Sequence, residues 1–172
     1  LEILHEYGIT QEAMGVPVIA SNEVTLLGQT SRGIQVYFDS LCLREADLII
    51  PINRVKLHTD FVDTIQSGMC KMLVIGLGNH KGCTAIHEAN FSYFGETLKE
   101  AVRLILSRAR VGFGVAIMEN AYDQTSLIEA VPARQMLARE AQLVELAREN
   151  MPLLMIPEID VLVVERIGKD IS

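Results

Sequence analysis

Three of the four histidines in this chain lie in one segment, together with three of its lysines. The segment runs from residue 53 to residue 87, and it contains His58, His80 and His87 with Lys56, Lys71 and Lys81. An imidazole titrates near neutral pH, so it can carry a proton in catalysis or ligate a metal ion. Isolated histidines on loops are also commonly just solvated. Composition therefore marks this segment as a candidate site without fixing its chemistry.

Lys71 is placed unusually, because it stands inside the apolar stretch Met69 to Ile75. Two interpretations remain open. The amine can reach the surface on its long aliphatic stem. Alternatively it is held in a desolvated environment, where a lysine becomes a nucleophile for covalent chemistry.

Two common motifs do not account for this segment. The glycines Gly76, Gly78 and Gly82 do not form a dinucleotide fingerprint, because Lys81 stands where GxGxxG requires glycine. His80 and His87 would share a face only if one helix continued through Gly82. Imidazole ligands suit zinc, nickel or copper, and the lack of a cysteine pair argues against a structural zinc.

The candidate segment follows an apolar run, Leu48 to Ile52, that is predicted to be a strand buried on both faces. Ligands of α/β sheets bind at the carboxyl ends of such strands. The next apolar run, Gly68 to Gly78, is either a buried strand or a buried helix, and periodicity does not decide between them.

The rest of the chain alternates between predicted strands and helices. Strands are predicted at Val16–Ala20, Val24–Leu27, Ile34–Phe38, Val111–Met118, Leu127–Val131 and Val161–Glu165, and helices near 1–7, 10–13, 84–89, 94–105 and 134–150. This order predicts an α/β fold with a mixed, mostly parallel sheet flanked by helices. Residues 1–172 are expected to form one domain, with the last strand, 160–165, leading into a second domain.

Composition narrows the classes of partner. The net charge of −7 with no basic stripe argues against nucleic acid. No apolar run approaches the roughly 20 residues of a membrane span. Three cysteines without a CxxC pair do not form a disulfide framework, so a cytoplasmic protein is expected.

Several blocks of the sequence resemble one enzyme family. They are residues 52–61, residues 66–78, Lys81-Gly82 through His87, Glu119–Asp123 and Asp160–Val164. Together they resemble the nickel-pincer-dependent lactate racemase superfamily, in its lactate-racemase-like branch. The resemblance covers nearly the whole chain, and the central block is its most specific part.

The resemblance implies a cofactor, an activity and three site residues. Family enzymes carry a nickel-pincer nucleotide tethered to a lysine amine. Lys71 matches that lysine, His87 matches the nickel ligand sixteen residues later, and His58 matches a general acid/base. The implied activity is racemisation or epimerisation of a small 2-hydroxyacid, by hydride abstraction and return. The implied partners are a C-terminal domain of the same protein and the enzymes of pincer biosynthesis.

The match has departures, and other functions stay open. His58 stands a few residues further from Lys71 than in characterised lactate racemases. Their second acid/base histidine and substrate arginine, and the lysine of their second domain, have no counterpart assigned here; Lys169, His80, Lys56 and Lys81 carry no assigned role. The alternatives are a non-catalytic binding domain that keeps the fold, and a zinc or iron enzyme using His58, His87 and an acidic partner such as Asp60.

Overall fold

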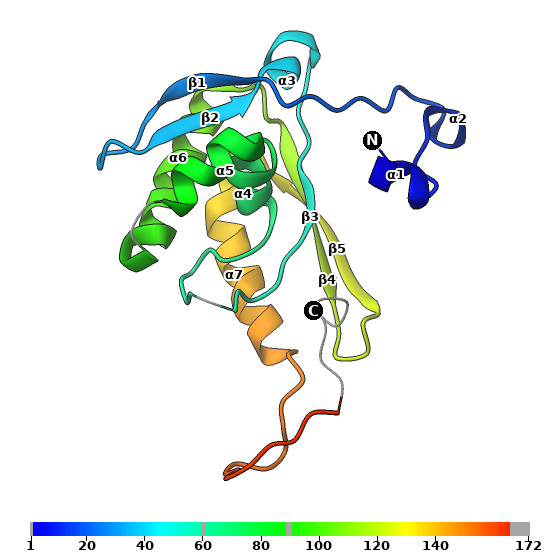
Figure 1. Cartoon of the computed structure of the whole chain (residues 1–172), viewed down its shortest axis with the longest axis vertical. Coiled ribbons are helices and arrows are strands. Elements are labelled where there is room, and N and C mark those ends of the chain that lie inside the picture. The colour runs from blue at the N-terminus through cyan, green and yellow to red at the C-terminus, as the bar shows by residue number, and fades with distance from the viewer. Residues whose placement is uncertain (1, 60, 89–90, 166–172) are drawn as a thin grey trace.

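A mixed three-stranded sheet forms one part of the molecule (Figure 1). The computed structural model describes residues 2–59, 61–88 and 91–165. Strand β3 (Ile52–Arg54) pairs in parallel with β4 (Phe113–Glu119), and β4 pairs antiparallel with β5 (Thr125–Pro132). With helices flanking this sheet, the predicted α/β class is confirmed.

A two-stranded antiparallel ribbon lies at the other end of the core. It is formed by β1 (Val24–Gln29) and β2 (Gln35–Asp39). Helix α5 (Asn79–His87) packs on β2, and helix α6 (Phe94–Arg108) packs against both strands. The amphipathic spacing that predicts a helix from Phe94 is thereby confirmed.

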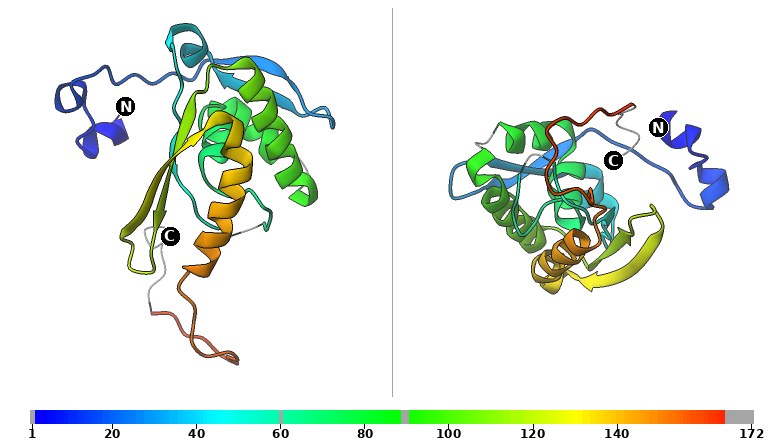
Figure 2. Two further views of the ribbon diagram at one scale, coloured as in Figure 1. Left: turned by 180° about the vertical axis from the view of Figure 1, so that it is seen from behind. Right: turned by 90° about the horizontal axis from the view of Figure 1, so that it is seen from below.

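Helices cover the three-stranded sheet, as Figure 2 shows from two further sides. Helix α7 (Met136–Glu149) packs on β4 and β5, and the short helix α4 (Met69–Lys71) packs on β3, β4 and α7. Helix α4 continues into a π-helical segment, η1 (Met72–Gly76). The run from Gly68, for which strand and helix were both open, is therefore helical. The remaining short elements are α1 (Glu2–Glu6), α2 (Gln11–Met14), α3 (Ser40–Glu45), η2 (Phe91–Tyr93) and η3 (Ala133–Gln135).

One core joins these elements. The side chains of Phe38, Leu73, Leu98 and Leu143 are fully buried in one cluster, although they come from β2, η1, α6 and α7. Strand β4 alternates between buried and partly exposed residues, as expected when helices cover one face of a sheet. None of the helices in the described part of the chain is long and apolar enough to cross a membrane.

The predicted strand Leu48–Ile52 is wrong in two respects, because the regular strand starts later in the chain and most side chains of the segment are exposed. Ile49 is buried and makes an isolated bridge to Val111, but Leu48, Ile50 and Ile52 are exposed, and the regular strand begins only at Ile52. The reason is that β3 is an edge strand. Pro51 has no N–H to donate to a neighbouring strand. Proline is tolerated on an edge strand, but there it interrupts the regular hydrogen bonding between strands.

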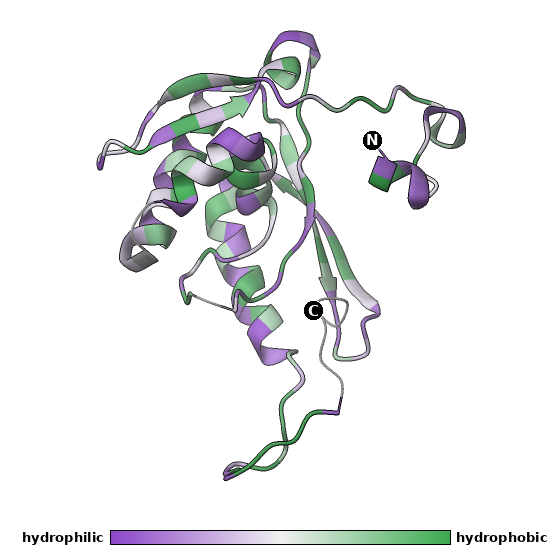
Figure 3. Cartoon of the chain, in the orientation of Figure 1, coloured by the Kyte–Doolittle hydropathy of each residue, from purple (hydrophilic) through white to green (hydrophobic). Residues whose placement is uncertain are grey.

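Two further predicted strands do not form. Val16–Ala20 and Val161–Glu165 are irregular in the structure and are largely exposed. Val163, for example, is 86 % exposed, and the hydrophobic residues of this C-terminal stretch stand clear of the core in Figure 3. A β-rich composition yields a strand only where another strand supplies hydrogen-bond partners, and no described strand pairs with either segment.

Candidate functional site

His58 lies on a loop that is closed by its own hydrogen bonds. At the base of the loop, Lys56 N donates to Ser67 O at 3.0 Å. Inside it, His58 N donates to Gln66 Oε1 at 2.8 Å, and Gln66 Nε2 donates to Asp63 O at 2.9 Å. Because the Gln66 side chain is buried, the backbone of His58 is held against the core.

Asp63 fastens this loop to helix α6. Lys99 Nζ lies 2.5 Å from Asp63 Oδ1, and the carboxyl group rests against Gly95, where a Cβ would come within 2.0 Å of Oδ2. Although burial opposes ionisation, hydrogen bonds from Lys99, Thr64 and Ile65 hold the pKa of Asp63 below its ordinary value. The loop that carries His58 is thus pinned to the start of α6 by a charged group.

Lys71 is half-buried and lies where α4 passes into the π-helical segment. The start of this helix is tied to strand β3, because Asn53 Nδ2 donates to Gly68 O at 2.9 Å. Single π-helical turns are rare and are frequently found at functional sites. The placement is intermediate between the two interpretations of Lys71, with part of the side chain covered and part accessible.

A sharp reversal then brings α5 back onto the segment that carries Lys71. A Cβ at Gly78 would lie 2.2 Å from Val74 O, so only glycine fits this turn. Asn79 follows with φ at 52°, and its Nδ2 donates to Asp39 Oδ2 at 2.9 Å. The sequence therefore encodes a helix–turn–helix arrangement between Lys71 and His87.

Helix α5 is continuous through Gly82, so His80 and His87 lie on one helix. Seven residues of α-helix span about 10 Å along the axis. That separation is too large for the two imidazoles to ligate one metal ion. His80 and His87 are therefore separate ligand candidates, and the family resemblance points to His87.

The ring of His87 is held in one tautomer. Its Nδ1 lies 2.8 Å from the carbonyl oxygen of Cys83 and 3.4 Å from Cys83 Sγ. A carbonyl oxygen only accepts hydrogen bonds, so Nδ1 carries the proton and Nε2 keeps its lone pair. Metal-ligating histidines commonly donate the N–H of their other ring nitrogen to a carbonyl oxygen in this way, and His87 is exposed.

A row of four rings connects His58 with His87. The centroids of His58 and Phe61 are 4.4 Å apart, those of Phe61 and Phe94 are 4.8 Å apart, and those of Phe94 and His87 are 5.5 Å apart. These are normal distances for packed aromatic pairs. The fold therefore brings together two histidines that are 29 residues apart in the sequence. Lys71 belongs to α4, which packs against α6, the helix that begins with Phe94.

Glu140 is a buried acid beside Lys71 that the sequence analysis missed. Its side chain is 0 % exposed, Oε2 accepts a hydrogen bond from Cys70 N at 2.9 Å, and Oε1 has no partner among the described residues. Burial raises the pKa of Glu140 to about 7, against the opposing effect of hydrogen bonds from Cys70 and Met69. A signal was present, because Glu140 falls on the apolar stripe of α7 formed by Met136, Leu143 and Val144.

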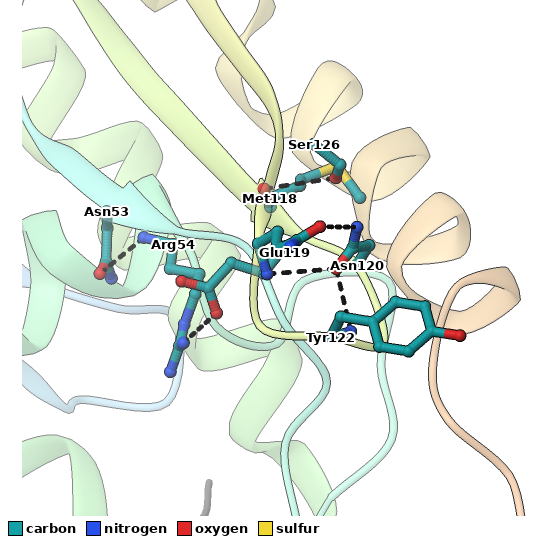
Figure 4. Close-up of polar contacts among 8 residues, drawn as sticks. Asn53, Arg54, Met118, Glu119, Asn120, Tyr122 and Ser126 are labelled. Carbon is teal, nitrogen blue, oxygen red and sulfur yellow. Dashed lines mark hydrogen bonds and ion pairs between the residues drawn. The ribbon is translucent and has the colours of Figure 1, made fainter.

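A separate cavity of about 400 Å³ lies at the carboxyl ends of β3 and β4. Arg54 and Glu119 form an ion pair on its wall, and Asn120 organises the turn after β4 by accepting from Tyr122 N at 2.9 Å (Figure 4). Thr59 contributes to the lining, but the ring of His58 packs on Phe61 instead. This cavity is therefore not part of the histidine row.

The other residues of the candidate segment have peripheral positions. His80 and Lys81 line a shallow depression of about 300 Å³, where the amine of Lys81 lies 4.4 Å from the ring centroid of Tyr37. Within the described residues, no group of three His, Cys, Asp or Glu side chains is placed to hold a metal ion. Asp60 and Lys169 lie outside the described residues.

Comparisons with known proteins bear on the fold. No protein-family model matches the sequence, and no curated protein is similar to it. Among solved structures, the lactate racemase apoprotein from Thermoanaerobacterium thermosaccharolyticum is similar, with a TM-score of 0.63 and 12 % sequence identity. The match covers 83 % of this chain and 36 % of that chain. The α/β fold is thus that of part of a lactate racemase, which agrees with the resemblance read from the sequence.

Proposed function

We propose that this chain carries the cofactor segment of a nickel-pincer nucleotide-dependent racemase or epimerase of a 2-hydroxyacid. The observation that supports it most is the ring row, which connects the two histidines implied by the family resemblance. The shared fold with the lactate racemase apoprotein gives independent support at the level of architecture.

The donor set fits such a cofactor. His87 offers Nε2 in a fixed tautomer, which is the form that a metal requires. Lys71 is the last residue of α4 and directly precedes the π-helical segment η1, which packs against α5, the helix of His87. In this proposal Lys71 provides the covalent attachment and His87 the nickel ligand.

Each residue has a definite chemical task. When bound, the nickel-pincer nucleotide supplies an acceptor that takes a hydride from C2 of the hydroxyacid and returns it to either face. His58 takes the proton from the substrate's hydroxyl oxygen and gives it back when the hydride returns. Its backbone is fixed through Gln66 and its ring is backed by Phe61, so the imidazole is oriented without being buried completely.

We propose further that residues 1–172 form most of a cofactor-carrying domain that works with a C-terminal domain of the same protein. The cofactor biosynthesis enzymes are then necessary partners, and the cytoplasm, where free thiols persist, is the proposed compartment. All three cysteines are free in the structure, which fits a reducing environment.

The test begins with the full-length protein coexpressed with the pincer biosynthesis enzymes. Intact-mass and peptide mass spectrometry should find the adduct on Lys71, with about one nickel per chain. Lys71→Arg should abolish the adduct and leave the circular dichroism spectrum unchanged. Lys81→Arg is the matched control, because Lys81 lies on the neighbouring helix α5 with its amine over the ring of Tyr37. An unmodified Lys71 in wild type would end the proposal.

Two further measurements separate the proposal from its competitors. His87→Ala should lose nickel far more readily than His80→Ala, and equal losses would remove the ligand role of His87. Racemisation of a panel of 2-hydroxyacids in D₂O should retain the original hydrogen at C2, because a hydride does not exchange with solvent. Deuterium at C2 would show that a proton is removed instead.

A further inference from the structure

We infer that Glu140 is a positioning residue for Lys71, acting through the hydrogen bonds that its buried carboxyl group makes to the first turn of α4. This inference rests on the proposed function for its relevance to catalysis. The contacts that carry it belong entirely to the described structure.

The carboxyl group sits at the free amides that begin α4. Oε2 accepts from Cys70 N at 2.9 Å, and the carboxyl group also lies against Gly68, the residue before α4. A helix leaves its first N–H groups without partners, and a carboxylate satisfies both the hydrogen bonds and the positive end of the helix dipole. Here the acid comes from α7, about 70 residues later in the chain, rather than from a local capping residue.

Gly68 shows that space is reserved for this contact. A Cβ at Gly68 would lie 2.6 Å from Cδ, 2.7 Å from Oε2 and 2.8 Å from Oε1 of Glu140. Its φ of 172° is ordinary extended backbone, so the constraint on Gly68 is steric rather than conformational. The residue before α4 is small because the carboxyl group of Glu140 occupies the volume that a side chain would fill.

Burying the Glu140 carboxyl group costs folding free energy, and an apolar side chain at the same position would avoid that cost. Glu140 is completely buried, Oε1 has no partner among the described residues, and an apolar side chain at this position of α7 would match Met136 and Leu143. Burying a carboxyl group with an unsatisfied oxygen is unfavourable. Such a group is expected where a precise local geometry matters, and the element that it holds is the three-residue helix ending at Lys71.

The experiment compares Glu140→Gln and Glu140→Ala in the full-length protein, with Glu145→Ala as a control on the exposed side of α7. An amide oxygen can still accept the bond from Cys70 N, whereas alanine cannot. Amide hydrogen exchange, measured without cofactor, should be on the order of tenfold faster for residues 69–74 in Glu140→Ala, as expected for a lost cap. Glu140→Gln and Glu145→Ala should exchange there as wild type does.

The second readout is the fraction of Lys71 that acquires the adduct on coexpression. Glu140→Ala should lose most of it while the rest of the chain keeps native exchange protection, and Glu140→Gln should restore it. If folded Glu140→Ala matches wild type in both exchange and adduct, the inference is wrong while the proposed function stands. If wild type itself acquires no adduct, the proposed function fails, and the exchange measurement alone decides whether Glu140 orders the Lys71 turn.

Discussion

Replacing Glu140 by glutamine should change how the stability of the protein depends on pH. In the folded chain, burial raises the pKa of this carboxyl group from an ordinary value of 4.5 to about 7. The folded state therefore holds the proton more tightly than the unfolded state does. The stability contributed by this group is fully present below pH 4.5, and it is lost progressively as the pH rises toward and through 7. The glutamine variant is neutral throughout and should lack this loss.

The size of the effect follows from the difference in pKa. One unit corresponds to about 1.4 kcal/mol, so a rise of about 2.5 units corresponds to a loss of about 3 kcal/mol between low pH and pH 8. The titratable group that faces Glu140 from α4 is Cys70, and desolvation together with the nearby Glu140 carboxylate raises the pKa of its thiol. The thiol therefore stays protonated across this range. Asp63 has a lowered pKa, so its contribution changes only in more acidic solution.

The assay is urea unfolding at intervals from pH 4.5 to pH 8.5 for wild type, Glu140→Gln and the control Glu145→Gln. The difference in unfolding free energy between wild type and Glu140→Gln should grow with pH in favour of the variant, by about 3 kcal/mol at most. The unfolding free energies of wild type and Glu145→Gln should differ by the same amount at every pH. A difference that stays constant over the whole range would refute the reasoning, because it would mean that Glu140 has an ordinary pKa.

Three other predictions follow from single contacts. Gly68→Ala should lower the free energy of unfolding by about 1–3 kcal/mol, because the new Cβ displaces the Glu140 carboxyl group. The loss should be much smaller in a Glu140→Ala background, and the control Gly82→Ala should lose little. Urea unfolding of this double-mutant cycle checks the prediction, and equal losses in both backgrounds would contradict it. Phe94→Leu should lower the free energy of unfolding by about 1–3 kcal/mol and shift the NMR signals of both His58 and His87. The control Tyr93→Leu, at an exposed residue, should shift neither signal. Unchanged histidine signals in Phe94→Leu would argue against the ring row. Long-range ¹H–¹⁵N spectra above neutral pH should show the Nδ1–H tautomer for His87, and an Nε2–H tautomer would remove the structural basis for its role as a ligand.

The parts of the fold that were predicted correctly are those with a local signal. Helix α6 follows from its 3.6-residue apolar spacing. The errors concern pairing. The strand predicted at Leu48–Ile52 is displaced by its edge position and Pro51, and Val161–Glu165 has no described strand to pair with. Strand formation depends on distant partners, which a single sequence does not specify.

The candidate site shows the same division. Residue types marked the segment from residue 53 to residue 87, and the resemblance to the lactate racemase superfamily implied His58, Lys71 and His87 as its site residues. The sequence could not indicate that Phe61 and Phe94 connect the two histidines, because that contact depends on how the loop of Asp63 docks on α6. It did contain one unused signal, the acid on the apolar stripe of α7. A charged residue at a core position is a conflict between local pattern and burial, and such conflicts concentrate where structure serves a site.

The two histidines are held in place by different contacts, and these contacts fit the tasks proposed for them. At His87, the Cys83 carbonyl fixes the proton on Nδ1, which suits a ligand that must stay neutral with one lone pair available. At His58, Gln66 Oε1 holds the backbone amide, so the loop is fixed while the ring rests on Phe61. A proton carrier needs a fixed position relative to its substrate, and the hydrogen bond to the backbone of His58 helps to fix that position. Under the proposed function, one imidazole of this segment would serve coordination and the other proton transfer, and the rings of Phe61 and Phe94 lie between them.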